Sequence, residues 1–245
     1  MNISGIDIEI IKKNIKNLHL SVLPPDGKVR VSAPLSISEE AIELFAISKI
    51  GWIKKQIEEF QNQPRQTERE YVSGESHYFF GNRYRMDIRY TKGNSKVEIQ
   101  GNKMLFTIRP DSTVEQRAST LNEWYRKQLR VKLPTLFEKW EEIIGVHANE
   151  VKIKDMLTKW GTCNVTDKRI WINLQLAKKP LPCLEYVVVH ELVHFKENTH
   201  NQHFVLLMDQ YLPDWRARKE TLNSFIMQNY ISTSNSINLS LDDDI

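Results

Sequence analysis

The sequence predicts an α+β protein whose N-terminal half is rich in β-strands and whose C-terminal half is mostly helical. Short segments of alternating apolar and polar residues, separated by turn residues, recur within 18–108. From residue 112 onward, apolar residues recur at helical spacing, with short strand-like segments between them. We therefore expect an N-terminal antiparallel β-rich domain with a helix over residues 1–110, followed by a helical domain with a small β-sheet over 111–231.

Composition places the chain among ordinary globular proteins. Its 245 residues are 40% hydrophobic and 27% charged, which is enough apolar material for a core. The net charge of +3 is small and gives no case for nucleic acid or membrane binding by itself. The cysteines, Cys163 and Cys183, make no disulfide framework and fit a reducing compartment. With no signal peptide pattern at the start and no apolar run near ~20 residues, we expect a cytoplasmic protein.

The first segments predict a hairpin and a helix. Alternating strands over 18–23 and 28–34 flank a turn, Pro24-Pro25-Asp26-Gly27. Ser38 is a candidate N-cap for a helix that runs from Glu39 to about Gln61. A polar linker over 62–70 comes next.

Four short strands are predicted after the linker. They cover 78–82, 83–90, 96–99 and 104–108, with turns at Gly93-Asn94 and Gly101-Asn102. We expect a small antiparallel sheet or partial barrel. His19 and His77 are single histidines in strand-like settings, and we interpret both as structural residues.

The C-terminal half begins with a long helix capped by Ser112 and ended by Gly145, with Pro134 as an expected kink or restart. Strands are predicted over 151–156 and 169–176. After a proline-marked connection over 177–183, a second helix is predicted from about Leu184. The Ser/Asn-rich tail, 232–245, ends in Asp242-Asp243-Asp244 and is expected to be disordered.

The second helix carries an apolar run that turns into His190-Glu191-Leu192-Val193-His194. Helical residues four apart lie on one face, so His190 and His194 can offer their imidazoles to a single ion. Glu191 lies beside them, where its carboxylate can reach a water without being a ligand. This arrangement is the signature of zinc hydrolases, in which the glutamate is the general base.

A catalytic zinc site needs a third protein ligand. His200 lies ten residues after His190, the spacing of the metzincin motif, although Glu197 stands where that motif has glycine. His203 is the second candidate and lies in the following helix. Whichever of the two histidines is not the third ligand can still contact a ligand or the substrate. Glu220 is a third candidate, and Cys163 is a candidate for a fourth, inhibitory or structural ligand.

The motifs as a set resemble the YgjP-like metallopeptidases, predicted metal-dependent hydrolases related to SprT-like proteases. The resemblance rests on segments that occur in the family's order, and it extends over about 18–230: Ala33-Pro34, Trp52-Ile53, Tyr84 after Gly81, Trp124-Tyr125-Arg126, Trp160-Gly161-Thr162-Cys163, Tyr186 to His194, and His200 with Phe204. The resemblance implies a zincin-like catalytic domain with His190, His194 and His200 as zinc ligands and Glu191 as general base.

Three departures from the family pattern stand near these residues. Thr162 replaces serine, Thr199-His200-Asn201 replaces Asn-His-Ser, and Val205 replaces a tryptophan. They keep a hydroxyl and the histidine, but they change the turn and the expected wall of the pocket.

We therefore expect a metallopeptidase with one zinc ion per chain and a peptide or protein substrate. Trp160, Gly161, Thr162, Cys163 and His203 are the candidate substrate-binding residues, with an extended substrate paired to a strand at Thr162–Asn164 or Arg169–Leu176. Trp160 fits core packing equally well. The alternatives are a zinc-containing module that acts on DNA or DNA-bound protein, or a hydrolase of non-peptide substrates. Lys152, Lys154, Lys159, Lys168 and Arg169, near Trp160 and Trp171, would form the DNA-binding patch, although net charge favours an ordinary solvated face.

Overall fold

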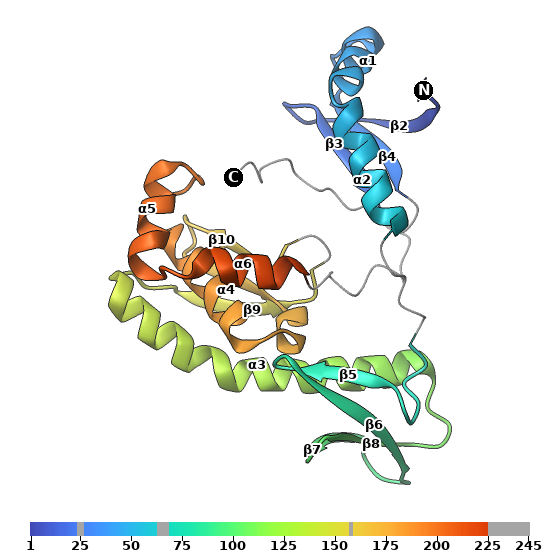
Figure 1. The fold of residues 1–245 in the computed structure, drawn as a ribbon, viewed down its shortest axis with the longest axis vertical. Helices are drawn as coiled ribbons and strands as arrows, with labels where there is room; N and C mark the ends of the chain where they lie inside the picture. The colour runs from blue at the N-terminus through green and yellow to red at the C-terminus, as the bar shows by residue number, and fades with distance from the viewer. Residues whose placement is uncertain (24–26, 63–68, 157–158, 225–245) are drawn as a thin grey trace. The chain divides into compact units, whose positions relative to one another are not determined.

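A computed structural model describes residues 1–23, 27–62, 69–156 and 159–224, and it has the predicted α+β class (Figure 1). The chain divides into two compact units with a boundary between Thr67 and Glu68. The predicted boundary at residue 110 differs from this one, because the strands within 76–108 share a core with the helices that come after them. The predicted tail, 232–245, lies outside the described residues.

The first unit is built on a four-stranded sheet with the order β1-β2-β4-β3. Strands β3 (His19–Leu23) and β4 (Lys28–Pro34) pair antiparallel, as the hairpin pattern predicts, although its turn residues 24–26 lie outside the described part. The sequence did not predict β1 (Asn2–Ile3) and β2 (Ile6–Lys13). Strand β2 pairs in parallel with β4. The sheet is therefore mixed.

The single helix predicted after Ser38 is two helices, α1 (Glu39–Ser48) and α2 (Ile50–Asn62). Ser38 caps α1 as predicted, because its hydroxyl accepts a hydrogen bond from the Ala41 amide. At the break, the Ser48 hydroxyl donates to the Phe45 carbonyl and the Lys49 amide bonds to Ala46 instead. This local competition for a helical carbonyl ends α1.

The second unit begins with the four predicted strands, β5 (Ser76–Phe79), β6 (Asn82–Tyr90), β7 (Lys96–Gln100) and β8 (Lys103–Ile108). Their order is β5-β6-β8-β7. The two outer pairs are antiparallel, whereas the central β6–β8 pair is parallel. The buried face of the sheet packs into the core of this unit.

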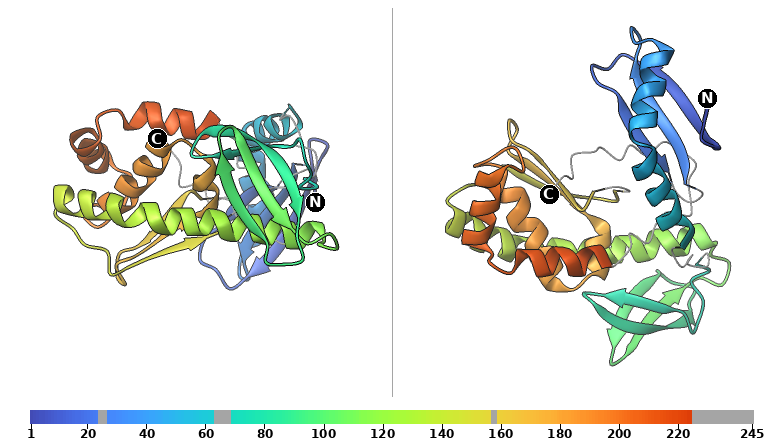
Figure 2. Two further views of the ribbon diagram at one scale, coloured as in Figure 1. Left: turned by 90° about the horizontal axis from the view of Figure 1, so that it is seen from below. Right: turned by 45° about the horizontal axis from the view of Figure 1, so that its top comes forward.

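Helix α3 (Val114–Ile144) spans the second unit and passes both of its sheets (Figures 1 and 2). Its cap is Thr113 rather than Ser112, because Thr113 and Gln116 form a reciprocal capping box. Pro134 lies inside the helix and does not end it. Gly145 ends it as predicted, with a left-handed φ of 72°.

A three-stranded sheet with the order β10-β11-β9 comes after α3, from β9 (Glu150–Lys154), β10 (Gly161–Asn164) and β11 (Arg169–Asn173). The predicted strand over 169–176 ends early, because the Asn173 side chain caps a 3₁₀ helix, η1 (Leu174–Lys178). Three helices complete the unit: α4 (Leu181–Val193), α5 (Gln202–Tyr211) and α6 (Trp215–Ser224). Among the described residues, no helix has the length and apolar character to cross a membrane.

Glu185 joins α4 to two neighbouring helices. Its carboxylate accepts hydrogen bonds from Lys139 Nζ and Trp140 Nε1 on α3, at 2.8 and 3.0 Å, and from Arg218 Nη1 on α6, at 2.6 Å. Burial raises the pKa of this carboxyl, but the hydrogen bonds outweigh burial and lower the pKa from 4.5 to about 2.

We expect Glu185→Gln to destabilise the protein by about 1–3 kcal/mol at pH 7, because charge-assisted hydrogen bonds contribute in that range. The folded pKa lies below the unfolded one, so the stabilisation is present above about pH 4.5 and is lost as the pH falls toward 2. Urea unfolding measures this effect: the difference in the free energy of unfolding between wild type and variant should be smaller at pH 3 than at pH 7. Glu98→Gln is the control, because Glu98 makes only an exposed ion pair with Lys96. An unchanged gap at the two pH values would contradict the assignment.

Candidate metal centre

Helix α4 is almost fully buried in the second unit. Val188, Val189, Leu192 and Val193 have no exposed surface, so packing on several sides fixes the helix. His190 and His194, one turn apart, remain partly exposed at its edge, with ring centroids 4.9 Å apart. The geometry that the four-residue spacing predicts is therefore present.

A tight turn after α4 returns the chain toward these rings. The Glu197 carboxylate accepts hydrogen bonds from the amide and the hydroxyl of Thr199, and the Glu197 carbonyl lies 3.1 Å from His194 Nδ1. Asn201 then caps α5 through the Phe204 amide. Glu197 thus shapes the turn at the position where the metzincin spacing has glycine.

The turn brings His200 to the other two histidines. One ring nitrogen from each of His190, His194 and His200 lies within 4.8 Å of the others, and His190 Nε2 is 3.0 Å from His200 Nε2. Burial lowers the pKa of His190 well below its ordinary value, and the charges of the other two rings lower it further. Burial also lowers the pKa of His194. The rings of His190 and His194 are therefore held neutral, the form in which imidazole binds a metal.

Within the described residues, this trio is the one cluster of histidine, cysteine and carboxylate groups with metal-ligand geometry. His203, Glu220 and Cys163, the other candidates for ligands, are not part of it. Three converging imidazole nitrogens fit the donor set of a catalytic zinc site.

Glu191 follows His190 in the chain and is 5% exposed. Burial raises the pKa of its carboxyl to about 8, against a smaller opposite effect from the charge of Lys159. Its side chain packs against the backbone of Gly161 on β10. The sequence placed Glu191 next to the ligands, but its contact with Gly161 comes from the tertiary fold.

Phe204 forms a common wall behind the three histidines and was not among the predicted site residues. Its ring centroid is 5.0 Å from that of His190 and 4.8 Å from those of both His194 and His200. The side chain is 3% exposed. The signal in the sequence was its position four residues after His200, which places it on the first turn of α5.

The other predicted site residues fall into two groups. Gly161 and Cys163 lie on the face of β10 toward Glu191. Burial, and to a smaller extent the charge of Glu191, raises the pKa of the Cys163 thiol to about 12. Thr162 lies on the opposite face of that strand. Trp160 packs partly against the core, with Lys179 Nζ 5.6 Å from the centre of its ring. His203 is exposed and lies 3.3 Å from Glu197, away from the trio.

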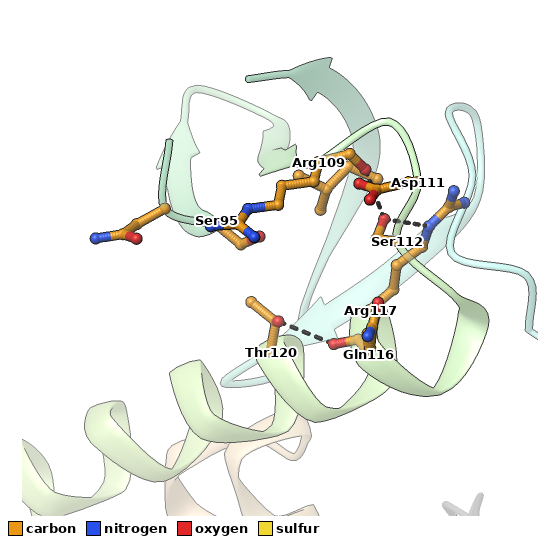
Figure 3. Close-up of a pocket in the computed structure, with 9 residues that line it drawn as sticks. Ser95, Arg109, Asp111, Ser112, Gln116, Arg117 and Thr120 are labelled. Atoms are coloured by element: carbon orange, nitrogen blue, oxygen red, sulfur yellow. Dashed lines mark hydrogen bonds between the residues drawn. The ribbon is translucent and has the colours of Figure 1, made fainter. Parts of the chain in front are cut away.

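Two polar features lie elsewhere in the second unit. On the sheet, Lys152 and Arg169 both form ion pairs with Glu150, so part of the suggested basic patch is neutralised. At the start of α3, a polar pocket of about 330 Å³ shares no residue with the trio (Figure 3). There the Arg117 guanidinium donates to Ser112, and Ser112 donates to the Arg109 carbonyl.

Comparison with known proteins gives one family match. The family described as "YgjP-like, metallopeptidase domain" matches residues 16–225. No curated protein matches the chain. Solved structures that match include the crystal structure of the metallopeptidase zymogen of Pyrococcus abyssi abylysin, at 21% identity, with 37% of this chain and 89% of that chain covered and a TM-score of 0.33.

The position of Phe204 generates a prediction. We expect Phe204→Leu to weaken binding of a divalent transition metal by about 10-fold, because the histidine rings lose the wall that fixes their orientation. Calorimetric titration of the metal-free protein with Zn²⁺ measures this change. Phe106→Leu is the control, since Phe106 is buried in the same unit but lies on β8. Equal loss of affinity in both variants would show a general effect of core packing instead.

Proposed function

Because the chain belongs to the YgjP-like metallopeptidase family, we propose that it is a zinc-dependent peptidase with its active centre at the histidine trio. In this proposal His190, His194 and His200 hold one zinc ion per chain. Glu191 is the general base. The convergence of three imidazole nitrogens, two of them on the helix that also carries the buried Glu191, is the observation that supports the proposal most strongly.

The donor set favours zinc. Imidazole is a preferred ligand of zinc, and catalytic zinc sites combine three protein ligands with one open position. The Glu197 carbonyl beside His194 Nδ1 fixes the orientation of that ring and leaves Nε2 for the ion. The chemistry that zinc supplies at such a site is acidification of water and polarisation of a carbonyl oxygen.

Glu191 supplies the proton transfers. Its carboxyl group is adjacent to His190 in the chain and is shielded from solvent, and its ionised form accepts a proton from water. The same carboxyl group then delivers the proton to the amine that leaves the cleaved peptide bond. Glutamate carries out both steps because it lies beside the ligands without being one of them.

A peptide substrate fits the edge of the small sheet. Strand β10 is at the edge, whereas β11 lies between β10 and β9. The segments predicted for substrate pairing are Thr162–Asn164 and Arg169–Leu176. The second forms β11 as far as Asn173 and has both neighbours occupied, so Thr162–Asn164 on β10 is the candidate that remains. An extended peptide added to β10 would run beside Glu191.

Metal analysis tests the proposed centre. Protein purified without added zinc should contain about one zinc per chain, and the double variant His190→Ala, His194→Ala should contain none. His147→Ala is the control, because this histidine is exposed, lies 2.8 Å from Glu141 and is not part of the trio. A wild-type protein that binds no zinc would remove the basis of the proposal.

The variant Glu191→Gln tests the role of the base. It should retain zinc and lose about 10²–10⁴-fold in kcat on an unfolded, fluorescein-labelled casein, because it removes the proton acceptor and keeps the shape of the side chain. Parallel assays of ester and amide model substrates would separate peptidase activity from hydrolysis of non-peptide substrates. Undiminished cleavage of casein by Glu191→Gln would refute the assigned role.

A further inference from the structure

Gly161 on β10 lies in direct contact with the Glu191 carboxyl group. A Cβ atom at Gly161 would stand 2.8 Å from both Cγ and Cδ of Glu191, and nearer still to Oε1. Carbon atoms in van der Waals contact are about 3.5–4.0 Å apart. Residue 161 therefore has no room for a side chain while Glu191 keeps its position.

The backbone of Gly161 does not itself require glycine. Its φ lies outside the left-handed region, in contrast to Gly81 and Gly145, whose φ values are +84° and +72°. Gly161 pairs regularly with Ile172 of β11 as part of an antiparallel ladder. An alanine would thus fit the backbone conformation, and its conflict would be with Glu191.

The strand cannot withdraw easily from Glu191. The amide of Asn173 donates to the Trp160 carbonyl at 2.9 Å, and the Asn173 side chain donates to the carbonyls of Met156 and Lys159 at 2.8 and 2.7 Å. Asn173 has no exposed surface. These bonds fix the backbone at the start of β10, so an added methyl group would displace the Glu191 carboxyl rather than the strand.

We propose that Gly161 is a positioning residue, whose missing side chain sets the place of the Glu191 carboxylate relative to the histidine trio. The inference rests on the proposed role of Glu191 as base. A base must lie within hydrogen-bond reach of the proton that it accepts, and a misplacement of about 1 Å can reduce a rate by about 10²-fold. Gly161 therefore acts on catalysis through the position of Glu191.

A double-mutant cycle with Gly161→Ala and Glu191→Asp tests this contact. On labelled casein, we expect Gly161→Ala in the zinc-loaded full chain to lower kcat by about 10²-fold and to change KM by less than about 3-fold. Aspartate is one methylene shorter and withdraws from the space that Cβ would occupy. Glu191→Asp should therefore lower kcat much less in the Gly161→Ala background than in wild type, whereas equal factors in both backgrounds overturn the proposal.

Unfolding of the metal-free protein gives a readout that is independent of activity. The urea midpoint should fall in Gly161→Ala and recover at least partly when Glu191→Asp is added, because the overlap is removed. Should Gly161→Ala not fold at all, the double variant is expected to fold, and failure of both overturns the proposal. Gly93→Ala is the control in the same unit, since its Cβ would make only an ordinary contact with Thr91 at 3.5 Å.

The two proposals fail in different ways. If Glu191→Gln cleaves casein as fast as wild type, the general base and the positioning role both fall. If Glu191→Gln is inactive while Gly161→Ala matches the wild-type kcat, only the positioning role falls. Zinc content should remain about one per chain in the wild type and in the three variants of the cycle, because none of the substitutions removes a histidine.

Discussion

The burial of α4 is the constraint on which the rest of the second unit depends. The helix carries a run of valines and leucines with no exposed surface, so it must be covered by other elements, and α3, α5, α6 and the strands β10 and β11 cover it. A helix held on several sides has little freedom to rotate, and His190 and His194 consequently keep a fixed direction. Glu191 is buried by the same packing, beside the edge of the small sheet.

The third histidine depends on polar bonds rather than on apolar burial. Glu197 serves twice in this turn, through its carbonyl toward His194 and through its carboxylate toward Thr199. The carboxyl has its pKa lowered to about 2, chiefly by the hydrogen bond from the Thr199 amide and also by His203. His203 therefore supports the turn that presents His200, which gives the second candidate histidine a structural place in the site without making it a ligand.

Periodicity predicts the local geometry of the candidate site, whereas its tertiary contacts could not be predicted from sequence. The relation of His190, Glu191 and His194 is local, because helical geometry alone sets it. Only the motif spacing and the family resemblance favoured His200 over His203 as the third ligand. The turn that presents His200 depends on side-chain hydrogen bonds, which no sequence pattern reveals. Gly161 acquires its place from a contact with a distant segment, and Phe204 acquires its place when the turn after α4 brings α5 back to the histidines. The parallel pairs in the two N-terminal sheets were missed for the same reason, because strand patterns do not specify crossover connections.

The domain boundary shows how such packing bears on the candidate site. The sequence pattern grouped the strands of the β5–β8 sheet with the N-terminal domain, yet the β5–β6 turn contacts the elements that lead into α4. The Phe80 amide donates to the Ala177 carbonyl, and a Cβ atom at Gly81 would lie 3.0 Å from Cα of Pro180, the N-cap of α4. On α3, the Tyr125 hydroxyl donates to the Tyr78 carbonyl. The sheet is thus fixed both to α3 and to the start of the helix that carries the histidines. Its position is best explained as support for α4. The compact unit that carries the histidines therefore includes the β5–β8 sheet as well as the motif-bearing helices.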